Sequence, residues 1–379
     1  MYTYSDVTVD VNPPTILLKF YTIHGVFALF FNVLGVFLIM KNPRIVKLYR
    51  GFMLNMQILS LLADAQTTLL MQPVYIFPII GGYTNGVWWN IFRMSSHLQM
   101  GIFLLLLYLQ VASIVCAIVT KFHVVSNIGK VGFMKSGKVS ENKFQSSKRP
   151  LLFWIFVVFY HSCAFLIFGI FCVSYLTKRE AVDLVKTKFP NAMNVFSLEN
   201  VEIYDLEVNK WMIGTTSLIA SMLVVGWIFE FPSVKNLNFQ SSLLISLYFS
   251  VRLLKKLRSK RLIISVRSFR GHQIAVTSLM AQATIPFIVI IIPIGTIVYF
   301  FVHVVPNAQY ISNAMMAIYS FHSSLSTTVM IISTPQYRKM IRRGFRSPTA
   351  AISPQMTRVV PNSANSATIR MKKLSTPDL

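Results

Sequence analysis

Long apolar runs separated by short polar segments dominate this chain. A helix needs about 20 mostly apolar residues to cross the roughly 30 Å of hydrocarbon in a membrane. Seven runs meet that length, and each is expected to be helical because lipid cannot hydrogen-bond an open backbone. The predicted spans are Ile16–Met40, Phe52–Met71, Met94–Val119, Leu151–Thr177, Trp211–Phe229, Ala275–Val305 and Ala308–Ile332.

A further apolar stretch, Leu243–Leu254, is only about a dozen residues long and too short to cross a membrane. It follows Phe231–Ser242, where Pro232 and several polar residues interrupt the hydrophobic pattern. We interpret Leu243–Leu254 as an extension of the fifth span or as a helix at the membrane interface, with an eighth span as the remaining alternative. The segment Met1–Pro14 lacks the basic start of a cleaved signal peptide, so the first span is expected to be an uncleaved anchor.

Composition and charge support a membrane protein and predict its orientation. Of the 379 residues, 54% are hydrophobic and 13% are charged, whereas soluble domains carry about a quarter charged residues. The net charge of +24 is unevenly distributed, because 29 of the 36 basic residues fall in alternate connections and in the tail. The positive-inside rule therefore predicts an outer N-terminus and a cytoplasmic C-terminus. Basic residues placed in this way are not the mark of nucleic-acid binding.

Prolines are predicted to interrupt two of the spans. Pro73 and Pro78 end the second span, and a turn at Gly81–Tyr83 follows. Pro286 and Pro293 fall within the sixth span, which could act as a kinked hinge.

A block between the second and third spans resembles a known receptor family. The sequence from Leu69 to Gly86 reads LLMQPVYIFPIIGGYTNG, which is similar to the nematode seven-transmembrane serpentine chemoreceptors of class I (Sri) and less close to class H (Srh). The likeness extends from about Pro13 to Arg343. Supporting pieces are His24-Gly25, Asn32–Gly35, Asp64, Lys121–His123, Gly271-His272, Gln282, His322-Ser323 and Pro335–Arg338.

This resemblance implies an all-α seven-transmembrane helix bundle of GPCR type that serves as a G-protein-coupled chemosensory receptor. Two features depart from the receptor pattern. Phe231–Ser242 looks like an insertion in what should be one fifth helix, and it is the basis for the alternative of a non-signalling receptor-like protein. Cys116, Cys163 and Cys172 all fall inside predicted spans, so we expect no disulfide between span three and the second outer loop.

We predict an extracellular N-terminus over residues 1–15, a receptor domain over 16–345 and a disordered cytoplasmic tail over 346–379. The receptor domain should end in a short amphipathic helix on the bilayer, because Tyr337, Met340, Ile341 and Phe345 share one helical face.

Asp64 is the acidic residue deep inside a predicted span, and intramembrane carboxylates are costly and usually functional. It could hold a cation, or be protonated and hydrogen-bond to span seven, where Ser323, Ser326 and Thr327 are candidate partners. The alternative is an interhelical hydrogen bond that only fixes packing. A resemblance to the sodium site of rhodopsin-like receptors is an analogy of fold.

Polar residues toward the outer ends of the spans are candidates for a ligand pocket open to the outside. No two histidines have helical i, i+4 spacing, so no metal site is predicted, and no nucleophile–base pair or phosphate loop indicates an enzyme or a cofactor. The candidate ligand-binding residues are His97, Gln99, Thr215, Thr216, Tyr319 and His322.

Basic residues on the predicted inner face could dock a heterotrimeric G protein, or serve topology and attraction to anionic lipid. The residues predicted to face the G protein are Lys121, His123, Arg252, Lys255, Lys256 and Arg258.

The function expected from the resemblance is a chemoreceptor for an unknown small molecule in the plasma membrane, and the resemblance also implies a sensory-neuron cilium as its location. A multi-pass transporter or ligand-gated channel is the first alternative, although a transporter should show paired ionisable residues in several spans. A non-signalling receptor-like membrane protein is the second.

Overall fold

The computed structural model describes residues 9–42, 47–127, 150–205 and 307–344, with isolated positions between 273 and 305. The predicted fifth span, the Phe231–Ser242 segment and the basic cluster that begins at Arg252 lie outside these residues, as does most of the predicted sixth span. Residues 1–340 form one compact unit and residues 341–379 a second.

Helices occupy the positions of the other five predicted spans. They are α1 (Thr15–Lys41), α2 (Lys47–Ala65) continued by the π-helix η2 (Gln66–Met71), α4 (Ser96–Asn127), α6 (Pro150–Val173), and α11 (Ala308–Ser320) followed by α12 (His322–Ser333). By length and hydropathy, α1, Ser96–Ala117 and Ala308–Ser333 could each cross a membrane, and Val157–Val173 joined to Lys178–Lys188 through a 75° bend could be a fourth such segment within the described parts of the chain.

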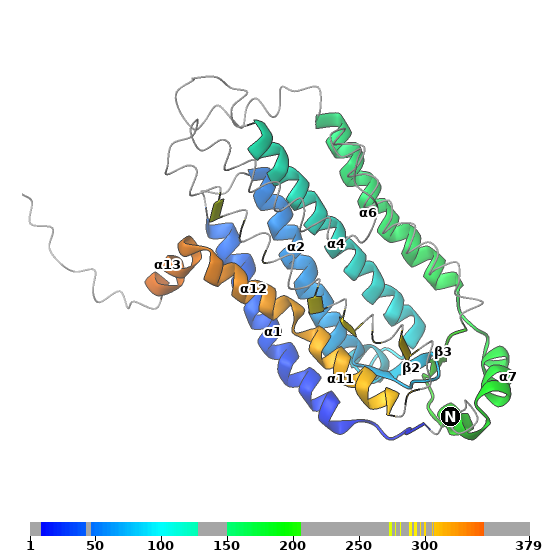
Figure 1. Cartoon of the computed structure of the whole chain (residues 1–379). Coiled ribbons are helices and arrows are strands. Elements are labelled where there is room, and N and C mark those ends of the chain that lie inside the picture. Colours follow the sequence, from blue (N-terminus) through cyan, green and yellow to red (C-terminus); the bar gives the residue numbers. More distant parts are fainter. Residues whose placement is uncertain are drawn as a thin grey trace, which may run out of the picture. The chain divides into compact units, whose positions relative to one another are not determined.

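The helices pack with polar residues inward and large apolar residues outward, the reverse of a soluble bundle. In α1, Phe27, Phe30 and Phe37 are 60%, 66% and 52% exposed, whereas Asn32 is completely buried. Helix α2 packs between α1 and α4, α4 packs against α6, and α12 lies against α1 (Figure 1). Gly25 permits the close approach of α1 to η2, because an added Cβ would lie 2.5 Å from the Thr68 hydroxyl oxygen.

The sequence predicted a turn at Gly81–Tyr83, and this was wrong, because these residues lie in a strand. Strands β1 (Pro73–Tyr75), β2 (Gly81–Thr84) and β3 (Glu202–Ile203) form an antiparallel sheet in the order β1-β2-β3. Gly82 must be small, because an added Cβ would lie 2.5 Å from the Val74 carbonyl oxygen. Pairing between sequence-distant segments overrides the local turn preference of consecutive glycines, and the helical bundle therefore carries a small sheet.

The sheet belongs to a cap at the end of the bundle where α1 begins and α2 ends, which is the outer end in the predicted orientation. The cap also contains α7 (Lys178–Lys188) and the 3₁₀-helix η3 (Pro190–Ser197). A hydrophobic cluster joins them, with Val74 and Ile79 from the first outer loop, Val185 from α7 and Ile203 from β3. A capping box begins α7, in which the Thr177 hydroxyl and Glu180 carboxylate each accept the other's backbone N–H.

Cys116 and Cys163 are buried, Cys172 is half-buried, and none of the three, all within described helices, forms a disulfide. The second outer loop is tied to the first by the β2–β3 pairing and the shared hydrophobic cluster instead.

Helix α13 (Pro335–Gly344) is found where an amphipathic helix was predicted. Tyr337, however, is 2% exposed, and the neighbouring Gln336 accepts a 2.9 Å hydrogen bond from the Asn42 amide. The prediction that Tyr337 faces the bilayer was therefore wrong, because the first turn of α13 packs on the bundle.

Candidate functional site

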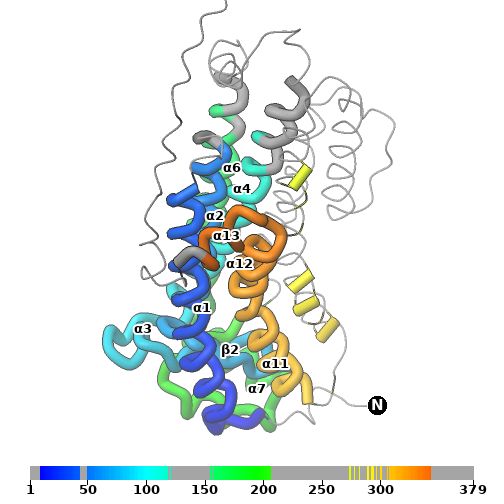
Figure 2. Tube along the Cα trace, turned by 90° about the vertical axis from the view of Figure 1, so that its left-hand side faces the viewer, coloured from blue at the N-terminus to red at the C-terminus, as the bar shows by residue number. Residues whose placement is uncertain are grey.

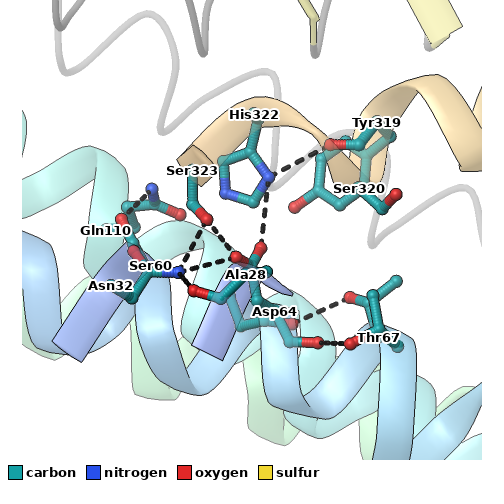
Figure 3. A network of polar contacts seen from close by, with 12 residues as sticks. Ala28, Asn32, Ser60, Asp64, Thr67, Gln110, Tyr319, Ser320, His322 and Ser323 are labelled. Carbon is teal, nitrogen blue, oxygen red and sulfur yellow. Dashed lines mark hydrogen bonds and ion pairs between the residues drawn. The ribbon is translucent and has the colours of Figure 1, made fainter. Parts of the chain in front are cut away.

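Asp64 lies at the centre of a buried polar network that joins α1, α2 and α12 (Figure 3). Its side chain is almost fully buried, and its Oδ2 accepts hydrogen bonds from the Asn32 amide at 2.8 Å and from the Ser323 hydroxyl. Asn32 also lies 2.9 Å from the Ser323 hydroxyl oxygen. The carboxylate therefore links three helices at one point.

The network continues from Asn32 along α2 and α12. Gln57 donates its side-chain N–H groups to the Asn32 amide oxygen at 2.6 Å and to the Thr327 hydroxyl at 2.8 Å. Asn32, Gln57 and Thr327 are all buried. Buried polar groups need such partners, because an unpaired donor or acceptor away from water costs about 1–3 kcal/mol.

His322 faces Asp64 from the first residue of α12. Its Nδ1 lies 3.7 Å from Asp64 Oδ1 and 3.1 Å from the backbone carbonyl oxygen of Tyr319, to which it donates when that nitrogen carries the proton. The imidazole stacks on the Tyr319 ring, with centroids 4.9 Å apart. Within the described residues, Asp64 Oδ1, His322 Nε2 and the Tyr319 hydroxyl have no hydrogen-bond partner.

The break between α11 and α12 at Phe321 places His322 beside the carboxylate. His24 Nε2 lies 2.9 Å from the Ser320 carbonyl oxygen, so the ring can donate to this carbonyl at the break. The His24 ring also lies 4.5 Å from the Phe321 ring. Helix α1 therefore supports the break that orients His322.

Tyr319 and His322, two of the predicted ligand residues, adjoin this network on its outer side. Tyr319 packs edge-on against Phe103 of α4, with centroids 5.6 Å apart. It belongs to an apolar cluster with Tyr21 of α1 and Met71 of η2. Ser326, which was predicted with Asp64 and Ser323, is buried one turn further along α12.

His97 lies in a different group, at the junction of α4 with α6 and the cap. Its ring stacks on Phe171 at 4.5 Å, and its Nδ1 shares a 3.2 Å hydrogen bond with the Tyr204 hydroxyl. The Glu202 carboxylate accepts a hydrogen bond from the His97 backbone N–H. Burial raises the pKa of Glu202 above its ordinary value, and this hydrogen bond partly opposes the shift.

Gln99 is completely buried near the start of α4. Its side-chain amide donates to the Met94 carbonyl oxygen at 2.8 Å, and its backbone carbonyl oxygen accepts a 2.9 Å hydrogen bond from the Gln66 side-chain amide. None of the described contacts joins Gln99 or His97 to Tyr319 or His322.

The remaining predicted site residues lie outside the described parts. Thr215 and Thr216 fall in the predicted fifth span, and the side chains of Lys121 and His123 are outside the described set. The same holds for Arg252, Lys255, Lys256 and Arg258, so these assignments stay predictions.

Sequence reasoning missed Gln57 and Tyr204. A usable signal existed for Gln57, because it precedes Asp64 by two helical turns in a mostly apolar run and therefore shares its helix face. Tyr204 carried no such signal, because its place follows from the pairing of β2 with β3.

Comparison with known proteins identifies the family. The family model described as "Serpentine type 7TM GPCR chemoreceptor Sri" matches residues 7–341. The fold is similar to the crystal structure of squid rhodopsin, with a TM-score of 0.52 and 12% sequence identity over 93% of this chain and 91% of that one. No curated protein is significantly similar in sequence. The chain therefore belongs to the Sri family of serpentine seven-transmembrane GPCR chemoreceptors, and is a multi-pass membrane protein with a rhodopsin-like helical fold.

Proposed function

We propose that this receptor binds a small molecule from the extracellular side and transmits the signal to a heterotrimeric G protein, without catalysing a reaction. Family membership over nearly the whole bundle supports the receptor class. The charge bias supports an outer N-terminus and a cytoplasmic C-terminus in the plasma membrane. The family resemblance extends this location to a sensory-neuron cilium.

The observation that carries the proposal is the Asp64–Ser323 link, reinforced by Asn32. A ligand shifts a conformational balance only by binding one state better than the other. Any movement of α12 relative to α2 must change the partners of the buried carboxylate. This network is thus a joint that holds one receptor state and must rearrange in the other.

We propose that a proton, rather than a metal cation, completes this joint. Asn32 and Ser323 both present donors to Asp64 Oδ2, and the imidazole of His322 faces Oδ1. Hydrogen-bond donors stabilise a carboxylate, and a facing imidazole can share a proton with it. A hard cation instead requires several oxygen ligands. No group of three or more His, Cys, Asp or Glu side chains that could hold a metal ion occurs in the described parts of the chain.

The ligand pocket is proposed to include Tyr319 and His322, with His97, Gln99, Thr215 and Thr216 as further candidates. Tyr319 stacks on His322, which in turn faces Asp64. A ligand that displaces the Tyr319 ring would therefore move the imidazole relative to the carboxylate. The Tyr319–His322 stack could therefore transmit ligand binding in the outer pocket to the hydrogen-bond network around Asp64.

On the inner face, Lys121, His123, Arg252, Lys255, Lys256 and Arg258 are proposed to contact the G protein. Their positive charge fits an acidic partner surface and also the anionic inner leaflet. Substituting Arg252, Lys255, Lys256 and Arg258 with alanine should weaken signalling and leave ligand binding intact.

The proposal is tested by expressing the receptor at the cell surface with a panel of G proteins and screening volatile and water-soluble small molecules for second-messenger responses. A compound that activates the wild type should act more weakly on Ser323→Ala. The matched control is Ser113→Ala, which removes a partly buried 2.7 Å hydrogen bond from Asn55 between α2 and α4, outside the network. Ligand-evoked ion currents or solute uptake without any G protein would favour the channel or transporter alternative.

A further inference from the structure

A short apolar projection extends from the outer end of the bundle between β2 and α4. It comprises the one-turn helix α3 (Val87–Asn90) and the residues up to Arg93. Ile91 is 69% exposed and Phe92 is 62% exposed, and Val87 beside them is also exposed. Figure 2 shows α3 projecting sideways from the bundle at the level of β2.

Hydrogen bonds and close backbone packing attach the base of this projection to η2. The Gly86 backbone N–H donates to the Met71 carbonyl at 3.0 Å, and Trp88 Nε1 donates to the Gln66 amide oxygen at 2.9 Å. An added Cβ at Gly86 would lie 2.3 Å from the Leu70 carbonyl oxygen, so the chain here lies directly on η2. The backbone N–H groups of Arg93 and Met94 donate to the carbonyl oxygens of Trp89 and Trp88, respectively, and these hydrogen bonds close the turn.

The position of the projection continues a lipid-facing surface. Ile58 and Leu62 are exposed apolar residues one turn apart on α2, and Gln66 is the next position on the same row. Gln66 is itself covered, and Trp88 is bonded to it. The exposed loop therefore begins where the lipid-facing row of α2 ends.

The composition of the projection matches the membrane–water interface. Tryptophans concentrate at that depth because the ring is apolar and its N–H is polar. Arg93 stacks on Trp89 at 5.0 Å and lies 3.7 Å from the Glu199 carboxylate, with both charged side chains largely exposed. The cationic end thus lies beside the aromatic base. The Phe92 ring contacts the Trp88 ring, with centroids 5.3 Å apart, but Ile91 and Phe92 both remain mostly exposed.

We propose that Val87–Arg93 is a membrane anchor in which Ile91 and Phe92 insert into the outer leaflet and Trp88, Trp89 and Arg93 lie at the level of the lipid headgroups. The occupant of this apolar patch is lipid. The anchor fixes the depth of η2, and through it the outer end of the helix that carries Asp64.

The test uses the full chain in nanodiscs that each hold one receptor, with phosphatidylcholine and phosphatidylglycerol as the lipids. Ile91→Cys and Phe92→Cys are prepared in a Cys172→Ala background and labelled with an environment-sensitive fluorophore. The matched control is Lys178→Cys, an exposed site in the cap. We expect doxyl-labelled lipid to quench the labels at 91 and 92 at least threefold more than the label at 178, and aqueous iodide to quench in the opposite order.

Equal iodide quenching at all three positions would overturn the proposal, because it would place the loop in water. Protection of 91 and 92 from both quenchers would also overturn it, because a protein surface would then cover the patch. Brominated-lipid quenching of tryptophan in unlabelled wild type against Trp88→Phe/Trp89→Phe provides a second measurement that needs no cysteine. These readouts do not depend on ligand or G protein, so they can fail while the proposed function stands.

Discussion

His322 Nδ1 lies 3.7 Å from Asp64 Oδ1, across the contact between α2 and α12, and at the break where α11 ends. Both side chains are almost completely buried. The pair is held from opposite sides, by Asn32 and Ser323 on the carboxylate and by the stacked Tyr319 on the imidazole. A polar contact that is supported on both sides changes when one of its supports moves, whether that support is a neighbouring side chain or the helix that carries it.

Two substitutions of Asp64 should distinguish the effect of its charge on stability from the effect of its hydrogen bonds. Asp64→Asn keeps the side-chain shape and an acceptor oxygen for Asn32 and Ser323, so it should fold with a small loss of stability. Asp64→Leu leaves the buried Ser323 hydroxyl without its acceptor and takes one of three acceptors from the Asn32 amide, which costs about 1–3 kcal/mol. Thermal unfolding of the purified receptors in detergent measures the difference, and equal stability of Leu and Asn variants would show that the network does not hold the bundle.

Gly82 is predicted to tolerate no side chain. In Gly82→Ala the new Cβ would meet the Val74 carbonyl 2.5 Å away and push β1 from β2. The matched control is Gly51→Ala in α2, where an added Cβ meets nothing within 4 Å and alanine improves helix propensity by about 0.5–1 kcal/mol. We expect surface expression to fall for Gly82→Ala and to be retained for Gly51→Ala; the reverse order would contradict the sheet.

The stability of the cap should depend on the ionisation of Glu202. Burial raises its pKa in the folded state above the ordinary 4.5, so its contribution is fully present below pH 4.5 and is lost as the pH rises through the folded pKa. Glu202→Gln keeps an acceptor for the His97 N–H and removes the buried charge. The variant should melt at a higher temperature than wild type at pH 7 and at the same temperature near pH 4. A lower melting temperature at pH 7 would indicate a favourable charge partner instead.

The membrane helices could be predicted from sequence because hydrocarbon thickness and backbone hydrogen bonding leave few choices. The predicted Ile16–Met40 is α1 within one residue at each end. Pro73 was correctly read as the end of span two, and η2 ends directly before the Gln72-Pro73 pair. The partner of Asp64 could not be singled out in this way, because the sequence offered Ser323, Ser326 and Thr327 as candidates.

The cap could not be predicted in the same way. Its sheet pairs Gly81 with Ile203, residues whose distance along the chain hides their contact from any local pattern. Tyr204 and His97 meet for the same reason. The orientation of Tyr337 depended on which surface the first turn of α13 packs against, and the amphipathic pattern fits bundle and bilayer equally.

The most direct test of the account is a double-mutant cycle on G-protein activation. Nucleotide exchange, basal and evoked by an activating compound, is measured for wild type, Asp64→Asn, His322→Asn and the double variant at equal surface expression, with Ser113→Ala as the control. If the two residues form one joint, each single variant should shift activation, and the double variant should resemble the stronger single variant rather than the sum. Additive effects, or wild-type activation in both single variants, would contradict the claim that Asp64 and His322 act together in one network that changes on activation.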